Sequence, residues 1–228
     1  MPDTNHHSVS IRDATVDDLE TIASWQCRFL PYGLFPRLGE RFVRRWHATF
    51  MDGPYGVALI ADLLTPTGRV PVGFLVGSTD EHQHIHHVLR THRIRLAITG
   101  LAALVLRPSL CVHFLRTRAK TYISRIFKGA DGRLPPPEYG DVAQGIQTAV
   151  VTAVAVTPNV RGSGVGRNLL ARFIEQSRTA GAPKAELVAM ADADNTDDFY
   201  KKLGWALVSE HISKDGVVAR TFRYEIDD

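Results

Sequence analysis

Apolar positions recur along this chain with two different periods, which predict strands that alternate with amphipathic helices. Short apolar runs bounded by turn residues predict strands at 9–12, 57–63, 70–76, 148–156, 185–190, 205–210 and 218–226. Apolar residues spaced three and four apart predict helices at 17–30, 38–50, 168–176 and 196–203. The last two strands are expected to form a hairpin, because a short polar run, Lys214-Asp215-Gly216, separates them.

One strand–turn–helix unit in this pattern is rich in glycine. The strand Ala149–Val156 runs into Thr157-Pro158, and the turn Arg161–Arg167 carries glycine at every second position before the next helix begins. Backbone N–H groups at a helix start lack partners within the chain, and the helix dipole places partial positive charge there. Glycine lets a phosphate approach the backbone closely, and arginine adds charge-assisted hydrogen bonds. The unit therefore predicts a site for a phosphorylated cofactor.

The glycine spacing distinguishes between kinds of phosphate-binding loop. A Walker A loop is excluded because no Gly-Lys-Ser/Thr follows, and a dinucleotide fingerprint is excluded because position 167 is arginine. The segment resembles the acyl-CoA loop of the GNAT acetyltransferase superfamily, Arg/Gln-x-x-Gly-x-Gly/Ala, with Arg161, Gly164 and Gly166 in its defined places. A glycine-rich turn without a ligand is the alternative interpretation.

This resemblance implies acetyl-CoA as the co-substrate, held between the strands 148–156 and 185–190, and no metal. Backbone groups of Val154 and Val156 would pair with the pantetheine arm, and one N–H would polarise the thioester carbonyl. The implied cofactor-binding residues lie in the strand end and the loop: Val154, Ala155, Val156, Arg161, Gly162, Ser163, Gly164, Val165, Gly166 and Arg167.

A second motif follows at residues 195–205. It resembles the late helix of the same family, which ends in Phe/Tyr-Tyr-x-x-x-Gly-Phe. Asn195 is predicted to cap this helix, and Gly204 suits its left-handed end. The resemblance implies that Tyr200 protonates the departing thiolate and that Asn195 contacts pantetheine. A tyrosine that only fills the core is the alternative for Tyr200.

The start of the chain agrees with this family. Residues 9–19 resemble its first strand and first helix, and Thr15 with Asp18 forms a variant capping box. The resemblance implies an α/β (α+β) fold with a central mixed, mostly antiparallel sheet flanked by helices. We expect a single GNAT-like domain over residues 1–228, with a helical insertion at 81–145 between the third and fourth strands.

The predicted insertion carries the basic character of the chain. Residues 82–130 contain nine Lys or Arg and no Asp or Glu. Because the net charge of the whole chain is +3, the residues outside this segment carry a net charge of −6. Its apolar spacing predicts two or three amphipathic helices, followed by a polar linker with three consecutive prolines. Three roles are open. The preferred one is a lid or acceptor-binding wall for an anionic substrate.

The second role for the insertion is a solvated helical face that packs on the domain or on another subunit, which includes a homodimer. The third is peripheral contact of residues 90–128 with an anionic membrane, or nucleic-acid binding, and nucleic acid is not expected as a partner. The histidines of 82–87 suggest a metal site as a further alternative, because alternation would place three of them on one side of an extended segment. No carboxylate or cysteine is close to that run, so solvated histidines, or histidines lining an anion pocket, are favoured over a metal.

The identity of the general base stays open. Residues 146–157 contain no Asp, Glu or His, and Val150 stands where some members of the family place a glutamate. Candidates at strand ends and in the linker are Asp192, Asp194, Glu210, His211, Glu138 and Asp141. An amine that is already neutral in a dry pocket needs no base.

The sequence thus favours a cytoplasmic, acetyl-CoA-dependent N-acetyltransferase. Two cysteines, Cys27 and Cys111, make no disulfide framework, and neither a signal peptide nor a membrane span is visible. The preferred acceptor is a small anionic amine, such as an amino sugar, an amino acid or a natural-product intermediate. Alternatives are a protein N-terminal or lysine acetyltransferase, and a non-catalytic acyl-CoA-binding or membrane-associated module.

Overall fold

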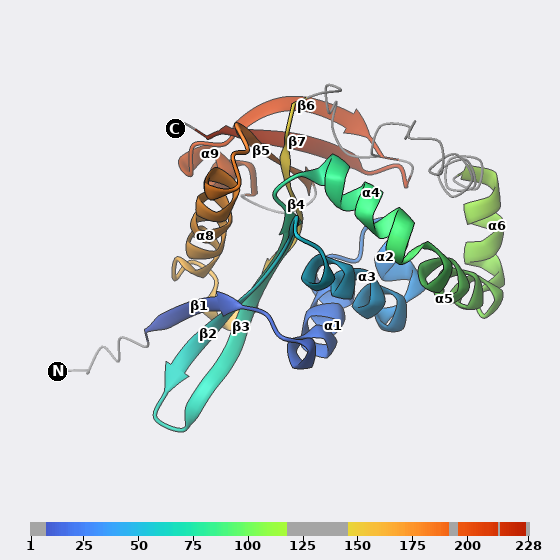
Figure 1. The fold of residues 1–228 in the computed structure, drawn as a ribbon, viewed down its shortest axis with the longest axis horizontal. Coiled ribbons are helices and arrows are strands. Elements are labelled where there is room, and N and C mark those ends of the chain that lie inside the picture. The colour runs from blue at the N-terminus through green and yellow to red at the C-terminus, as the bar shows by residue number, and fades with distance from the viewer. Residues whose placement is uncertain (1–7, 118–145, 192–195, 214, 227–228) are drawn as a thin grey trace.

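A mixed sheet of seven strands forms the centre of the protein (Figure 1). The structure is a computed structural model that describes residues 8–117, 146–191, 196–213 and 215–226. The strand order is β1-β2-β3-β4-β5-β7-β6, and only β4 and β5 run parallel, which confirms the predicted mixed, mostly antiparallel sheet. The strands are β1 Val9–Asp13, β2 Gly56–Thr65, β3 Gly68–Ser78, β4 Ala149–Val156, β5 Lys184–Met190, β6 Ala206–Ile212 and β7 Val218–Glu225.

Helices cover both faces of the sheet. One group, α1 to α6, lies on one side, and α8 and α9 lie on the other (Figure 1). The helices are α1 Leu19–Phe29, α2 Leu34–Leu38, α3 Glu40–Asp52, α4 Glu81–Thr91, α5 Arg93–Val105, α6 Pro108–Thr117, α8 Val165–Thr179 and α9 Thr196–Lys202. Two short 3₁₀ helices are η1 Val16–Asp18 and η2 Pro158–Val160. None of the described helices is long and apolar enough to cross a bilayer.

Each face of the sheet has its own apolar core. On the α8 side, Leu169 and Phe173 recur at helical spacing and are fully buried among strand residues such as Leu187. On the other side, Trp46 of α3 meets Phe50 edge to face at 5.3 Å between ring centroids. Complete burial of such side chains stabilises a fold by about 1.5–3 kcal/mol each. The two cores together hold the sheet in the middle of the domain.

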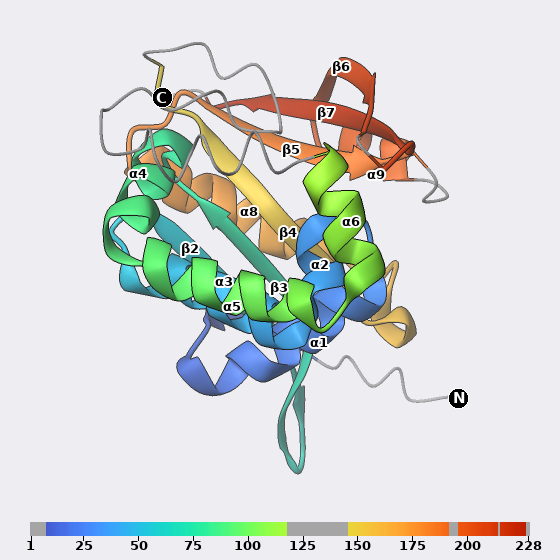
Figure 2. The same ribbon diagram turned by 90° about the vertical axis from the view of Figure 1, so that its right-hand side faces the viewer.

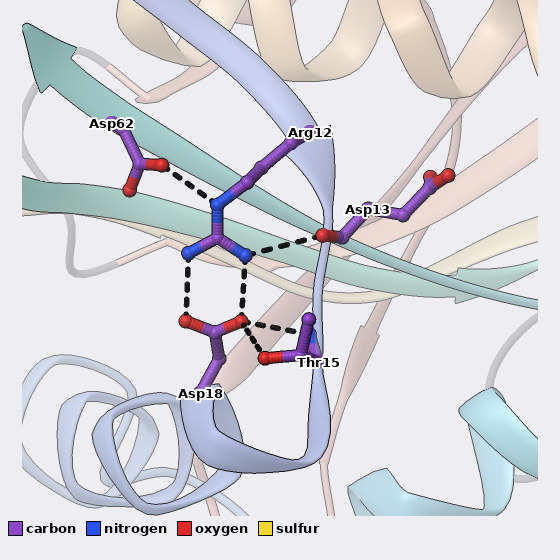
Figure 3. A network of polar contacts seen from close by, with 5 residues as sticks. All are labelled: Arg12, Asp13, Thr15, Asp18 and Asp62. Atoms are coloured by element: carbon purple, nitrogen blue, oxygen red, sulfur yellow. Dashed lines mark hydrogen bonds and ion pairs between the residues drawn. The ribbon is translucent and has the colours of Figure 1, made fainter. Parts of the chain in front are cut away.

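A polar network fixes the first helix to the sheet (Figure 3). Arg12 of β1 donates two hydrogen bonds to the Asp18 carboxylate, at 2.7 and 2.8 Å, and a third to Asp62 of β2 at 2.7 Å. The backbone N–H of Thr15 donates to the same Asp18 carboxylate at 2.7 Å, as the predicted capping box requires. The bonds from Arg12, opposed by burial and aided by Thr15, lower the pKa of Asp18 to about 2.

Three described helices, α4 to α6, follow β3, and α5 and α6 lie where the apolar spacing predicted amphipathic helices. The histidines of 82–87 do not lie on an extended segment, because residues 81–91 form α4. Asp80 caps this helix by accepting a hydrogen bond from the backbone N–H of Gln83 at 3.0 Å. Residues 118–145, which complete the predicted insertion and include Glu138 and Asp141, lie outside the described residues.

Candidate active site

The two parallel strands separate part of the way along. β4 and β5 pair at three positions only, from Ala149 opposite Ala185 to Val151 opposite Leu187. Both strands continue past this point, β4 to Val156 and β5 to Met190, without pairing with each other. A wedge therefore opens between the carboxyl ends of β4 and β5, which is the position predicted for the cofactor.

A β-bulge lies where the strands part. Opposite Val76 and Gly77 of β3 stand Ala153 and Val151, so Thr152 is the extra residue in β4. The bulge reverses the alternation of the strand: Ala149 and Val151 belong to the core under α8, whereas Ala153 and Ala155 belong to the opposite core. Bulges bend a strand and increase its twist, which accounts for the divergence of β4 from β5 at this residue. Thr152 is the one exposed residue of β4.

The backbone of β4 points into this wedge at two of the predicted residues. Thr157 donates its backbone N–H to the carbonyl of Val72 at 2.9 Å, at the end of the β3–β4 ladder. Because successive residues in a strand direct their backbone groups to opposite sides, Val156 and Val154 direct theirs away from β3. The Val156 carbonyl accepts a hydrogen bond from Nε of Arg161 at 3.1 Å, which agrees with that direction.

The glycine-rich turn forms a cradle of backbone donors at the start of α8. Gly162 and Gly164 have φ angles of 81° and 89°, with open space where a Cβ would be, so backbone conformation alone calls for glycine there. The first intrahelical bond runs from the N–H of Asn168 to the carbonyl of Gly164. Among the described residues, no backbone carbonyl accepts from the N–H groups of Val165, Gly166 or Arg167. These three donors and the helix dipole make an anion site.

The arginines of the turn differ in how they are held. Arg161 spans from the Val156 carbonyl to α1, where its guanidinium carbon lies 5.8 Å from the ring centroid of Phe29. Arg167 is exposed beside the free N–H groups. Arg161 is thus oriented by two contacts before any anion binds, whereas Arg167 provides a solvent-accessible charge.

Helix α9 reaches the cradle through Phe199. A Cβ on Gly166 would lie 3.3 Å from Cζ of Phe199 and 3.7 Å from Cγ2 of Val156. The tip of the Phe199 ring therefore lies close to Gly166 at the start of α8, where Val156 at the end of β4 also approaches. This aromatic side chain was not among the predicted site residues, although it directly precedes Tyr200.

Tyr200 occupies the core beneath α8. Its ring packs against Phe222 at 5.2 Å and Trp205 at 6.2 Å between centroids, and the residue is 7% exposed. Burial raises the pKa of Tyr200 to about 12, so the phenol keeps its proton across the physiological range. Asn195, predicted to start this helix, lies outside the described residues, as do Asp192 and Asp194.

The two described candidates for the base lie on different faces of the sheet. Glu210 pairs with Arg220 at 2.6 Å, and Arg220 also binds Asp197 of α9 at 2.8 Å, so this carboxylate belongs to a surface network on the α9 side. His211 is exposed and stands opposite Ala219 in the β6–β7 pair, on the other face.

A buried carboxylate that the sequence analysis missed lies close to the wedge. Glu186 of β5 stands opposite Val150, one residue before the last pair of β4 and β5, and is 3% exposed. Its neighbours Ala185 and Leu187 face the α8 core, so Glu186 lies on the opposite face. Oε1 of Glu186 accepts hydrogen bonds from Nε and Nη2 of Arg223 at 2.9 and 2.8 Å, and Nζ of Lys184 lies 4.0 Å away. The available signal was two charged residues, at 184 and 186, in an otherwise apolar strand.

The prediction of solvated histidines holds for His82, which is exposed, but is wrong for His84, which packs in the core. His84 is fully buried and stacks on Phe50 at 4.1 Å between centroids. Burial, with a smaller contribution from His87 and His92, lowers the pKa of His84 to about 4, so the ring is neutral. Within the described residues, no group of three or more His, Cys, Asp or Glu side chains could hold a metal ion.

Comparison with known proteins finds one matching family model and several structures with the same fold. Residues 139–226 match the family model described as an acetyltransferase (GNAT) domain. No curated protein sequence matches the chain significantly. Among solved structures, Arabidopsis thaliana NAA60 in complex with acetyl-CoA aligns with a TM-score of 0.56 at 12% identity, over 97% of this chain and 100% of that one.

Two further structures have the same fold. YncA, a putative acetyltransferase from Salmonella typhimurium with acetyl-CoA, aligns with a TM-score of 0.55 at 12% identity, over 96% of this chain and 95% of that one. The ribosomal-protein-S18-alanine N-acetyltransferase from Escherichia coli aligns with a TM-score of 0.51 at 13% identity, over 97% and 96%. At these identities the likeness establishes the fold, and the family model matches the segment that carries the cradle and Tyr200. Residues 139–226 therefore match a GNAT acetyltransferase domain, and the chain as a whole has the fold of these acetyltransferase structures.

Proposed function

We propose that this acetyltransferase transfers the acetyl group of acetyl-CoA to the amine of a small acceptor that carries an anionic group. The observation that carries the proposal is the cluster of Lys184, Glu186 and Arg223, which lies beside the wedge on the face away from α8. Arg223 and Lys184 are the cations that would bind the anionic group, and Glu225 stands opposite Lys184 in the β5–β7 pair. Lys184 and Glu186 are buried, whereas the Arg223 side chain is 30% exposed. Burial of two charged groups costs desolvation energy, which is more readily explained at a binding site than in a structural core.

Acetyl-CoA is the acyl donor, and the geometry of the wedge suits it. The free N–H groups of residues 165–167 would hold the pyrophosphate, and the outward backbone groups of Val154 and Val156 would pair with pantetheine. The proposed cofactor-binding set remains that of the sequence analysis, Val154–Val156, Arg161–Arg167 and Asn195. This arrangement brings the thioester to the bulge at Thr152, where the wedge closes.

Tyr200 is proposed as the donor to the departing thiolate. Its pKa of about 12 lies well above that of an ordinary thiol, roughly 8.5, so complete proton transfer from the phenol is uphill. Tyr200 therefore acts mainly as a hydrogen-bond donor that stabilises the thiolate as it forms. The proton that finally resides on sulfur is balanced by the one lost from the attacking amine.

Glu186 is proposed to receive the proton of the amine. Both hydrogen bonds from Arg223 go to Oε1, which leaves Oε2 for the acceptor. Arg223 and Lys184 would bind the anionic group of the same molecule. A carboxylate on β5, opposite Val150, thus takes the place of the one that some members of the family carry on β4 itself.

The proposal is tested by thiol release from acetyl-CoA against amino sugar phosphates, amino acids, neutral amines and peptides. Arg223→Gln should raise KM at least tenfold for anionic acceptors and leave KM for neutral amines unchanged. Arg220→Gln is the matched control, because Arg220 is an ion-paired arginine of the same strand that lies on the α9 face. Glu186→Gln should lower kcat by about a hundredfold, the usual contribution of a general base. Equal effects of Arg223→Gln and Arg220→Gln would refute the acceptor assignment.

A protein N-terminus is the second candidate acceptor. The E. coli relative named above is an N-acetyltransferase for the alanine of a ribosomal protein, on the same fold. Turnover of short peptides with a free N-terminus, but not of anionic small amines, would support this acceptor class. Tight binding of acetyl-CoA without turnover of any amine would favour the non-catalytic module.

A further inference from the structure

Helix α5 exposes a continuous aliphatic stripe. Ile94, Ile98, Leu101 and Val105 follow one another at intervals of four, three and four residues, and are 65%, 63%, 63% and 70% exposed. At 3.6 residues per turn this spacing places all four on one line along a helix about 20 Å long. Single exposed aliphatic residues are common, but four on one helix face mark an interaction surface.

The stripe is not the core-facing side of α5. The opposite side packs on the domain, where Ala103 and Leu104 are buried and Gly100 approaches the ring of Phe42. The helix therefore has two apolar faces, of which the domain covers one. Figure 2 looks onto α5, which lies in front of α3.

The surroundings of the stripe are positively charged. Arg93 and Arg95 lie about 100° to either side of Ile94 on the helix, so they border the stripe on both edges. Arg45 of α3 lies beside the same helix, with Nη1 3.3 Å from Oγ1 of Thr99. The described part of this segment, residues 82–117, contains no acidic side chain, and the nearby Asp52 of α3 lies 3.8 Å from Nε2 of His92 at the start of α5. An aliphatic surface bordered by arginine is complementary to an anionic lipid layer, into which the arginine stems can extend alongside the apolar residues.

Other occupants fit this surface less well. A second copy of the chain packed through α5 would bring two basic, acid-free helices together, and their charges would repel. Protein interfaces concentrate their binding energy in Trp, Tyr and Arg, whereas this stripe consists of Ile, Leu and Val without an aromatic residue. We propose that α5 is a peripheral membrane contact that binds an anionic lipid surface through its aliphatic stripe and bordering arginines.

Such a contact leaves the cofactor cradle accessible. Helices α5 and α8 lie on opposite sides of the sheet (Figure 1), so a membrane bound at α5 does not cover the start of α8. The acetyltransferase would then act at a bilayer surface while acetyl-CoA enters from the aqueous side.

The test is co-sedimentation of the full chain with vesicles of phosphatidylcholine alone and of phosphatidylcholine with 30% phosphatidylserine, as the salt concentration is varied. The protein should sediment with the anionic vesicles only, and less as salt rises. Removing both bordering charges, in Arg93→Gln/Arg95→Gln, should weaken partitioning by roughly fivefold per arginine. Removing the stripe without changing charge, in Ile98→Asn/Leu101→Asn, should weaken it at least tenfold.

Ile212→Asn is the matched control, because Ile212 is 74% exposed on β6 and lies outside the stripe. It should sediment like the unaltered protein, and all variants should keep the same thermal midpoint. Absence of sedimentation with anionic vesicles would overturn the proposal, as would unchanged partitioning of the stripe variant. If the protein is a dimer in solution and the stripe variant is a monomer, the surface instead binds a second copy of the chain. If the protein binds an acidic polypeptide but no vesicles, the surface instead binds a protein.

Discussion

Two neighbouring glycines of the proposed cofactor cradle, Gly164 and Gly166, should respond differently to substitution by alanine. Gly164 has φ +89° and open space at its Cβ position, so only backbone strain opposes a side chain there. Left-handed backbone costs alanine about 1–2 kcal/mol, and the lower entropy of its unfolded chain returns about 0.4–1 kcal/mol. Gly164→Ala should therefore reduce the free energy of unfolding by about 1 kcal/mol, or about 2–4 °C in Tm for a domain of this size.

Gly166 lies inside the first turn of α8 and has no positive φ. Alanine there gains up to about 1 kcal/mol of helix propensity, and its Cβ would meet the end of the Phe199 ring at 3.3 Å, a contact the ring can relieve by a small shift. Gly166→Ala should leave the free energy of unfolding unchanged or raised. Any loss of acetyl-CoA affinity in this variant would come from crowding of the wedge by Phe199.

Urea unfolding gives the free energies, and isothermal titration gives the Kd for acetyl-CoA. Gly164→Ala should raise Kd about tenfold, because one misaligned N–H forfeits at least 1.4 kcal/mol of a charge-assisted bond. The control is Gly216→Ala, since Gly216 in the β6–β7 hairpin has φ +80° and equal open space. It should show the same stability loss and an unchanged Kd. Stability loss at Gly166 with none at Gly164 would refute the reasoning.

Three further predictions concern other parts of the fold. Tyr200→Phe should keep the thermal midpoint within a few degrees, because no described residue bonds the hydroxyl, while kcat falls about a hundredfold in single-turnover acetyl transfer. Asp18, whose pKa falls to about 2 in the folded state, contributes stability that is present above the unfolded pKa near 3.9 and is lost as pH drops toward 2. The difference in free energy of unfolding between wild type and Asp18→Asn, measured in urea, should therefore shrink from about 1–2 kcal/mol at pH 6 toward zero at pH 2. Deleting Thr152 removes the bulge but keeps Val151 and Ala153 on their observed faces, so circular dichroism should report a folded protein. This variant should no longer bind acetyl-CoA. Deleting Val188 from β5, the control, should unfold the protein.

The parts of the site that depend on short stretches of sequence were predictable. Strand, turn and helix follow one another within residues 149–179, and the conformation of Gly162 and Gly164 is set by the residue type itself. The capping box at Thr15 is equally local. The histidine run was expected to be solvated, but the N-cap at Asp80 starts α4 there, and the helix carries His84 into the core.

The parts that depend on pairing between distant strands were not predictable. Glu186 becomes a candidate for chemistry only because β5 sets it opposite Val150 and β7 brings Arg223 to it. The apolar strand around Glu186 marks this carboxylate as unusual, but the sequence does not reveal that Glu186 and Glu210 lie on opposite faces of the sheet with different partners.

The bulge at Thr152 depends both on local sequence and on the packing of distant elements. The run Ala149–Val156 reads as a regular buried strand, with threonine as its one polar interruption. In a regular strand Val151 and Ala153 would share a face, but they belong to opposite cores, so packing of α8 on one side and of α1 to α3 on the other requires one extra residue between them. The same residue bends β4 away from β5 and opens the wedge. The proposed cofactor site is therefore a consequence of packing two helical layers on one strand, and its position follows from the residue at which β4 passes from one core to the other.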